Sequence, residues 1–264
     1  MQIKSASQDL LALLLACLDV AMRPSPANIL HFFGAGEDEH KLRAQLASLQ
    51  RSKLLEKRGR GPASRLALTE SGRAAVWGGV NPAERWKRPW DGQWRLLLFD
   101  LPAGNKQLRL RLWRWLRSQR FGFLQLSVWI TPDAMAETCM PLRHLKLPPD
   151  SMVVMEGRPL APVSAQDMAN AAWDFPLINR GYQKAMDLAA QGLRMAHEPR
   201  VSRAQLCRWL AAERQAWLEP MSSDPLLPEA ILPAGYLGRQ AWALRQSAFA
   251  ELARKNEASI QQMM

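Results

Sequence analysis

The chain has 264 residues, of which 48% are hydrophobic, and its 35 Lys and Arg against 24 Asp and Glu leave a net charge of +11. That hydrophobic content excludes a disordered or fibrous chain, and at about 150 residues per domain the length predicts roughly two domains. Three widely spaced cysteines, at positions 17, 139 and 207, exclude a disulfide scaffold and a cysteine-rich zinc site, and they favour a reducing cytosol.

The sequence offers no candidate for a membrane span. Its longest apolar run, Leu10–Leu18, has nine residues, whereas a spanning helix needs about 20. Asp9 and Asp19 flank the run and no small-residue cleavage site follows it, which argues against a signal peptide. We therefore expect a cytoplasmic protein with no membrane partner, and the positive charge favours nucleic acid or an anionic ligand as a partner.

Three helices are predicted near the N-terminus, over residues 9–20, 26–32 and 38–53, from helical spacing, proline and glycine breaks and an acidic N-cap. The third has an apolar stripe formed by Leu42, Leu46 and Leu49. Small residues stand among basic ones on its other side, as in a helix that approaches base edges closely. The predicted DNA-binding residues of this helix are His40, Lys41, Arg43, Ala44, Ala47, Ser48 and Arg51.

A β-hairpin is predicted next, with strands at 54–58 and 65–69 and a tip containing Gly59, Gly61 and Pro62. A further helix begins after Thr69. Three helices followed by a hairpin with a basic tip are typical of a winged helix-turn-helix, in which the wing lies along phosphates. A small helical domain with a basic hairpin remains the alternative. The predicted DNA-binding residues of the wing are Lys57, Arg58, Arg60 and Arg65.

The excess positive charge lies in the N-terminal half. Residues 41–73 and residues 84–120 each have a net charge of +7, so the rest of the chain is slightly acidic. Two adjacent basic runs, the first inside the predicted DNA-binding motif, favour nucleic acid over an ordinary solvated surface, and binding there should weaken steeply with salt.

The middle of the chain is predicted to be a ferredoxin-like α+β domain. Residues 78–89 are interpreted as a linker. Strands are predicted at 94–99, 123–130 and 152–155 and a helix at 105–120, with a further helix before the last strand. The helix has apolar residues off its core stripe, Leu110 and Trp113, which indicate a second packing surface.

Asp100, at the end of the first of these strands in LLLFDLP, is the one residue singled out for chemistry. This stretch resembles the ferredoxin-like nuclease subunit of CRISPR adaptation systems, in which such an aspartate binds a divalent metal as a dimer pair. A metal-dependent nuclease using Asp100 is therefore an alternative hypothesis. The favoured interpretation is a strand-end cap that accepts backbone N–H bonds.

The C-terminal segment is predicted to be helical, over residues 164–172, 177–196, 202–217 and 233–258, with Ser202 capping the third helix. Its tryptophans suggest either an aromatic ligand pocket or, as we favour, core packing. They are Trp173, Trp209, Trp217 and Trp242. The four histidines are scattered, and no nucleophilic triad, Walker loop or dinucleotide fingerprint occurs, so neither catalytic nor metal-binding residues are predicted.

The predicted winged helix together with WDGQWRLLLFDLP, GFLQLSVWITPD and DPLLPEAILP resembles the PaaX-type transcriptional regulators, repressors of phenylacetate catabolism. The resemblance covers nearly the whole chain. It implies a winged helix-turn-helix at 1–78, a ferredoxin-like domain at 90–160 and a helical domain at 161–264. In the recognition-helix pattern of the family, Lys41, Ala44 and Leu49 are partly kept, whereas Lys53 stands where glycine is usual.

By this resemblance the chain is expected to be a homodimeric, sequence-specific repressor on palindromic double-stranded operator DNA. It is expected to be released by an acyl-CoA effector such as phenylacetyl-CoA, to need no cofactor and to have no enzymatic activity. A scaffold that binds nucleic acid without sequence preference is the remaining alternative.

Overall fold

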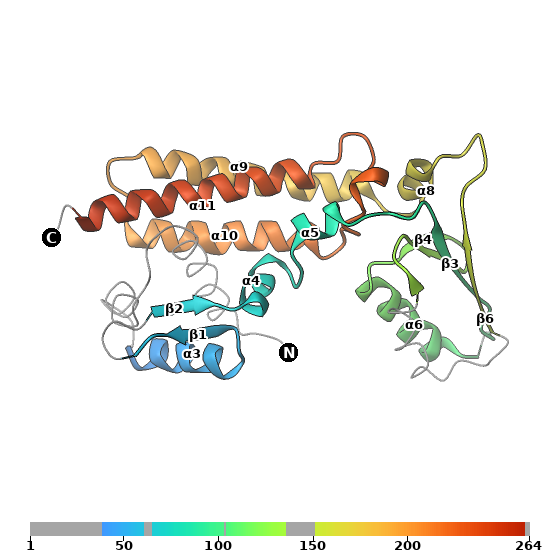
Figure 1. Ribbon diagram of the computed structural model, residues 1–264, viewed down its shortest axis with the longest axis horizontal. Helices are drawn as coiled ribbons and strands as arrows, with labels where there is room; N and C mark the ends of the chain where they lie inside the picture. The colour runs from blue at the N-terminus through green and yellow to red at the C-terminus, as the bar shows by residue number, and fades with distance from the viewer. Residues whose placement is uncertain (1–38, 61–64, 103, 136–150, 262–264) are drawn as a thin grey trace. The chain divides into compact units, whose positions relative to one another are not determined.

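The computed structural model describes residues 39–60, 65–102, 104–135 and 151–261, which form two compact units (Figure 1). Unit 1 contains the described residues up to 81, residues 181–221 and those from 237 onward. Unit 2 contains the described residues of 82–180 and of 222–236. The bounds of the three predicted domains stay a prediction, because compactness alone does not test them.

The described N-terminal part of unit 1 consists of α3 (Glu39–Arg51), an antiparallel hairpin of β1 (Leu55–Arg58) and β2 (Arg65–Leu68), and α4 (Glu70–Trp77). Leu46 and Leu49 of α3 are buried, as are Leu55, Leu66 and Leu68 of the hairpin. This confirms the third predicted helix, the hairpin and the helix after it. The helices predicted at 9–20 and 26–32 lie outside the described residues, so the complete winged helix-turn-helix stays a prediction.

The junction between α3, the hairpin and α4 is tightly built. The Thr69 hydroxyl donates a hydrogen bond to the Lys53 carbonyl at 2.7 Å and accepts one from the Gly72 backbone N–H at 3.0 Å, which caps α4. Gly72 is required here because a Cβ atom at this position would lie 2.1 Å from the Leu54 carbonyl oxygen. The orientation of the hairpin on α3 is therefore held by backbone contacts as well as by the apolar core.

Three long helices complete unit 1, namely the larger part of α9 (Phe175–His197), α10 (Arg203–Met221) and α11 (Gly238–Gln261). Ala189, Trp209 and Phe249, one from each helix, are buried in one apolar cluster. The predicted cap is confirmed, since the Ser202 Oγ accepts a hydrogen bond from the Gln205 backbone N–H at 3.2 Å. The predicted start of the last helix at 233 is wrong by five residues, because residues 233–237 continue the turn-rich connection.

The centre of unit 2 is an antiparallel sheet with the strand order β4-β5-β3-β6. The strands are β3 (Trp94–Phe99), β4 (Gly122–Gln125), β5 (Val128–Thr131) and β6 (Met152–Gly157), and α6 (Lys106–Ser118) joins β3 to β4. Leu112 and Leu116 of α6 pack with Leu97 and Trp129 of the sheet. In chain order this is the strand arrangement of a ferredoxin-like fold, and the second predicted helix lies outside the described residues.

Two local predictions in this unit are wrong. Residues 78–89 are not only a linker, since Pro82–Lys87 form α5, whose Trp86 side chain is buried. The single strand predicted at 123–130 is two antiparallel strands, β4 and β5, because the chain reverses at Leu126, where φ is +46°. Alternation of apolar and polar residues continues through this short turn, so periodicity alone did not reveal it.

The remainder of unit 2 is α8 (Ala165–Ala172), the start of α9 and the 3-10 helix η3 (Glu229–Ile231). Ser164 caps α8 in a capping box with Asp167. Gly122 is required against this helix, because a Cβ there would lie 2.6 Å from the Trp173 ring. The sheet and α8 therefore form one packed body.

Three of the four tryptophans of the C-terminal segment are buried core residues. Trp173 is buried beside Trp94, with ring centroids 6.0 Å apart. Trp209 is buried against Phe249, and Trp217 is buried within a cluster that includes Trp242. The core interpretation is thus confirmed for Trp173, Trp209 and Trp217, whose rings pack against neighbouring side chains.

Candidate nucleic-acid interface

The predicted recognition helix has the surface that DNA contact requires. Leu46 and Leu49 face the core of unit 1, so the other side of α3 points to solvent. The exposed residues on it are His40, Arg43, Ala44, Ala47, Ser48 and Arg51. Lys41 lies in the same helix, but its side chain is outside the described part of the structure. Two arginines beside two alanines and a serine give donors for base edges with no bulky side chain to hold the backbone away.

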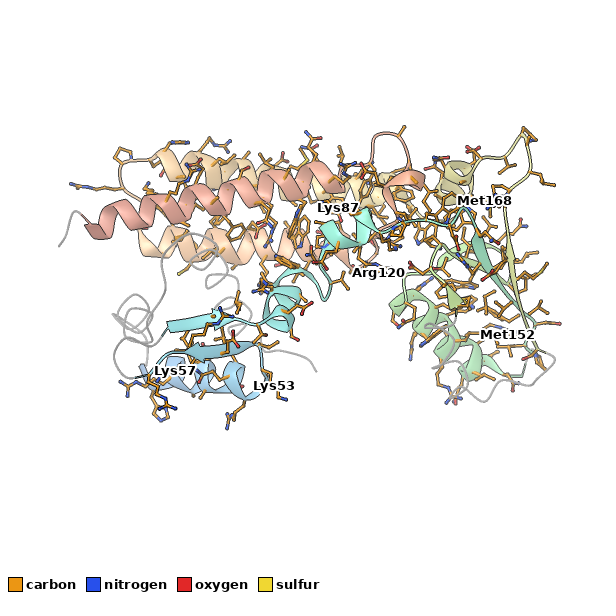
Figure 2. The ribbon with its side chains drawn as sticks, viewed as in Figure 1. Lys53, Lys57, Lys87, Arg120, Met152 and Met168 are labelled. Carbon is orange, nitrogen blue, oxygen red and sulfur yellow. The ribbon has the colours of Figure 1, made fainter. Side chains whose placement is uncertain are left out.

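The hairpin carries a second group of exposed basic residues, Lys57, Arg58 and Arg60. Figure 2 marks Lys57 on this hairpin. The Arg58 Nε donates to the Glu56 carboxylate at 2.7 Å, so part of its charge is compensated within the strand. Arg65 lies in β2 with its side chain outside the description, and its backbone stands directly opposite Arg58 in the ladder.

The residue after α3 explains one departure from the family pattern. Lys53 has φ +56°, in the left-handed region that favours glycine. Figure 2 marks this exposed lysine, whose backbone makes two hydrogen bonds. Its N–H donates to the Gln50 carbonyl of α3 at 2.9 Å, and its carbonyl accepts from the Thr69 hydroxyl. The glycine expected at this position therefore reflects the reversal of the chain between the helix and the wing.

Asp100, the residue of the alternative hypothesis, is exposed immediately after β3, and its backbone N–H donates to the Ser151 carbonyl at 2.9 Å. Within the described residues, no group of three His, Cys, Asp or Glu side chains is placed to hold a metal ion.

Sequence reasoning missed a polar network in unit 2. Asp133, just after β5, accepts hydrogen bonds from Arg85 and from the Arg88 Nε, both at 2.7 Å. Arg88 also donates to the Leu226 carbonyl, and Tyr236 donates to the fully buried Asp224 carboxylate. The DPLLPEAILP motif is thus fastened to the start of the domain by side chains. No local sequence pattern reveals this network, because Asp133 pairs with two arginines that lie more than 40 residues away in the chain.

The electrostatic environment of this network favours the ionised form of Asp133. Burial, the largest effect, raises the pKa of Asp133, but the charges and hydrogen bonds of Arg88 and Arg85 together outweigh it and leave the pKa below its ordinary value. Burial lowers the pKa of Arg88, and Asp133 opposes that effect. The network is therefore a structural clamp in which the Asp133 carboxylate is shared by two arginines.

The comparisons with known proteins agree with the ferredoxin-like fold of the central domain. Residues 87–169 match the family model described as the PaaX protein central Cas2-like domain, which confirms the predicted resemblance to PaaX-type regulators. An uncharacterized protein, Rv0674 from Mycobacterium tuberculosis, has a similar structure, with a TM-score of 0.60 and 20% identity over 97% of this chain and 99% of that one. No curated protein matches the chain. None of the described helices has the length and hydropathy needed for a membrane span.

Proposed function

We propose that this chain, PaaX-type by its central domain, is a transcriptional regulator that binds double-stranded DNA through α3 and the β1–β2 hairpin. The observation that carries the proposal is the exposed face of α3, where Arg43 and Arg51 stand beside small residues. A helix of this composition fits the major groove, and the exposed lysine and arginines of the hairpin fit neighbouring phosphates. Both elements fall in the more basic half of the chain.

The finer proposal is a repressor that acts as a homodimer on a palindromic operator and is released by phenylacetyl-CoA or another acyl-CoA. It is supported by the resemblance of the chain to PaaX-type regulators. The two half-sites of such an operator lie about one helical turn apart. The protein would need neither a metal nor a reactive side chain for this role.

The test measures binding of the full chain to the DNA upstream of its own gene by fluorescence anisotropy at about 150 mM salt, with a random duplex as competitor. Selective binding that phenylacetyl-CoA reverses would support both the repressor and its effector. Selective binding that ignores this compound would keep the DNA-binding regulator and reject the effector. Equal affinity for both duplexes would reject the regulator in favour of a scaffold without sequence preference.

Variants then test the assignment of α3. Arg43→Ala should weaken operator binding by about 1–3 kcal/mol if this side chain reads a base, and it should relax selectivity at one position. Arg194→Ala is a matched control, because Arg194 is also an exposed helical arginine, but lies in α9. If Arg43→Ala binds the operator as tightly as the control does, α3 is not the recognition helix.

A further inference from the structure

The stretch between Asp100 and Asp133 is unusual in its charge. It contains six basic residues and no Asp or Glu, and five of the six lie between 106 and 117, in α6. The predicted DNA-binding motif does not include this helix, and the fold uses only part of its charge. What the remaining arginines do is therefore a separate question.

Three other arginines of unit 2 are paired with carboxylates. Arg85 and Arg88 are paired with Asp133. Arg95, which is only 5% exposed, bonds to the Asp91 and Glu156 carboxylates at the centre of the sheet. Each of these three arginines stabilises the fold through a carboxylate within hydrogen-bonding distance.

Two basic residues of the acid-free stretch also have structural roles, although their acceptors are backbone carbonyls. The Arg109 guanidinium donates to the Leu101 carbonyl at 2.7 Å and holds the turn before α6. Arg120, labelled in Figure 2, donates to the Asp224 carbonyl. Neither bond involves the exposed arginines that lie between Arg109 and Arg120.

Those arginines are Arg111, Arg114 and Arg117, spaced three residues apart on the exposed side of α6, opposite Leu112 and Leu116. No salt bridge to any of the three occurs within the described ranges of the chain. Like charges three residues apart on a helix repel each other and disfavour it by a few tenths of a kcal/mol per pair. A row of this kind is stabilised when an external polyanion supplies the missing negative charge.

We propose that the exposed row Arg111–Arg114–Arg117 of α6 is a second DNA-contact surface, which binds the phosphate backbone without reading sequence. The proposal rests on the proposed function, because it adds a positioning contact to the base-reading contacts of α3. Three exposed guanidinium groups that have no carboxylate partner among the described residues fit the phosphodiester backbone, since arginine binds phosphate oxygens with two parallel hydrogen bonds. The central domain then contributes affinity, and α3 contributes selectivity.

The experiment compares the salt dependence of binding for the full chain and for the triple variant R111Q/R114Q/R117Q, on the upstream duplex and on a random duplex of equal length. Each phosphate contact contributes about 0.9 to the slope of log K against log salt, so the variant should lose up to about 2.7 from the slope. Between 50 and 200 mM salt, the affinity of the wild type should therefore fall about 40-fold more than that of the variant. The ratio of affinities for the two duplexes should stay the same, since these residues read no base.

A matched control removes the same charge elsewhere, in R180Q/R194Q/R208Q, whose three arginines are exposed on α9 and α10. An equal loss of slope in this control would overturn the proposal, because only net charge would then matter. An unchanged slope in the α6 variant would also overturn the proposal. So would an α6 variant that loses binding of coenzyme A but binds DNA as the wild type does, because the three arginines would then serve the effector and not DNA. Circular dichroism verifies folding, and the single variant R114E, which should weaken binding on both duplexes, provides a second test if the triple variant is unfolded.

The two proposals can fail separately. If the wild type binds neither duplex, the proposed function fails. If the wild type binds selectively and the α6 variant behaves like the wild type, only the second surface fails.

Discussion

Replacement of Lys53 by glycine should stabilise the protein. Lys53 lies two residues after the end of α3 and has φ +56°, and a left-handed conformation costs a residue with a Cβ about 1–2 kcal/mol. Glycine removes this cost but gains conformational entropy in the unfolded chain, which opposes folding by about 0.5–1 kcal/mol. The expected net gain in the free energy of unfolding is about 0.5–1 kcal/mol, because the hydrogen bonds from Thr69 and to Gln50 involve only the Lys53 backbone.

Urea unfolding followed by circular dichroism measures this gain, and Lys53→Ala is the control. Alanine removes the same exposed charge and keeps the Cβ, so Lys53→Ala should not reach the stability of Lys53→Gly. If the two variants unfold at the same urea concentration, the backbone at position 53 is not strained, and the physical reason given for glycine in the family pattern is wrong.

Two further predictions concern charges that are paired in the folded protein. Asp133→Asn should lower the free energy of unfolding by about 2 kcal/mol, because it weakens charge-assisted hydrogen bonds to Arg85 and Arg88. Since the folded pKa of Asp133 lies below its unfolded value, the wild type keeps this contribution above about pH 4 and loses it as the pH falls through the folded pKa. Thermal melts from pH 7 to pH 3 should therefore show a flatter acid decline for the variant, and equal declines would contradict the argument. Glu213→Leu should cost about 3–5 kcal/mol, because it leaves the Arg245 guanidinium, 1% exposed, without its carboxylate. The double variant with Arg245→Met should recover most of this loss in the same melts, and no recovery would refute the role of the pair.

Elements whose signal is local were predicted well from the sequence. The apolar spacing of Leu46 and Leu49, the strand at 94–99 and the helix that became α6 all follow from the repeat of side chains along one face. Six of the seven predicted DNA-binding side chains in the recognition helix are exposed, because the burial of one face of an amphipathic helix leaves the other in solvent. Their contact with DNA stays a prediction.

Features that depend on distant segments were not predictable. The hairpin of β4 and β5 needs the positive φ of Leu126, a conformation that leucine does not signal. The buried Trp86 side chain of α5 packs against Tyr236, 150 residues away, and its indole N–H donates a hydrogen bond of 3.0 Å to the Tyr236 hydroxyl. Arg88 likewise finds Asp133 only after the sheet has formed.

The sequence by itself determined the periodic helices and strands, the basic N-terminal half and the resemblance to PaaX-type regulators, because each depends on neighbouring residues or on composition. Only the tertiary structure decided which arginines are neutralised. It pairs Arg88 and Arg95 with carboxylates from other segments and leaves Arg111, Arg114 and Arg117 exposed on α6. A charge is compensated by what folding brings within a few ångströms of it, and that distance is a property of the fold.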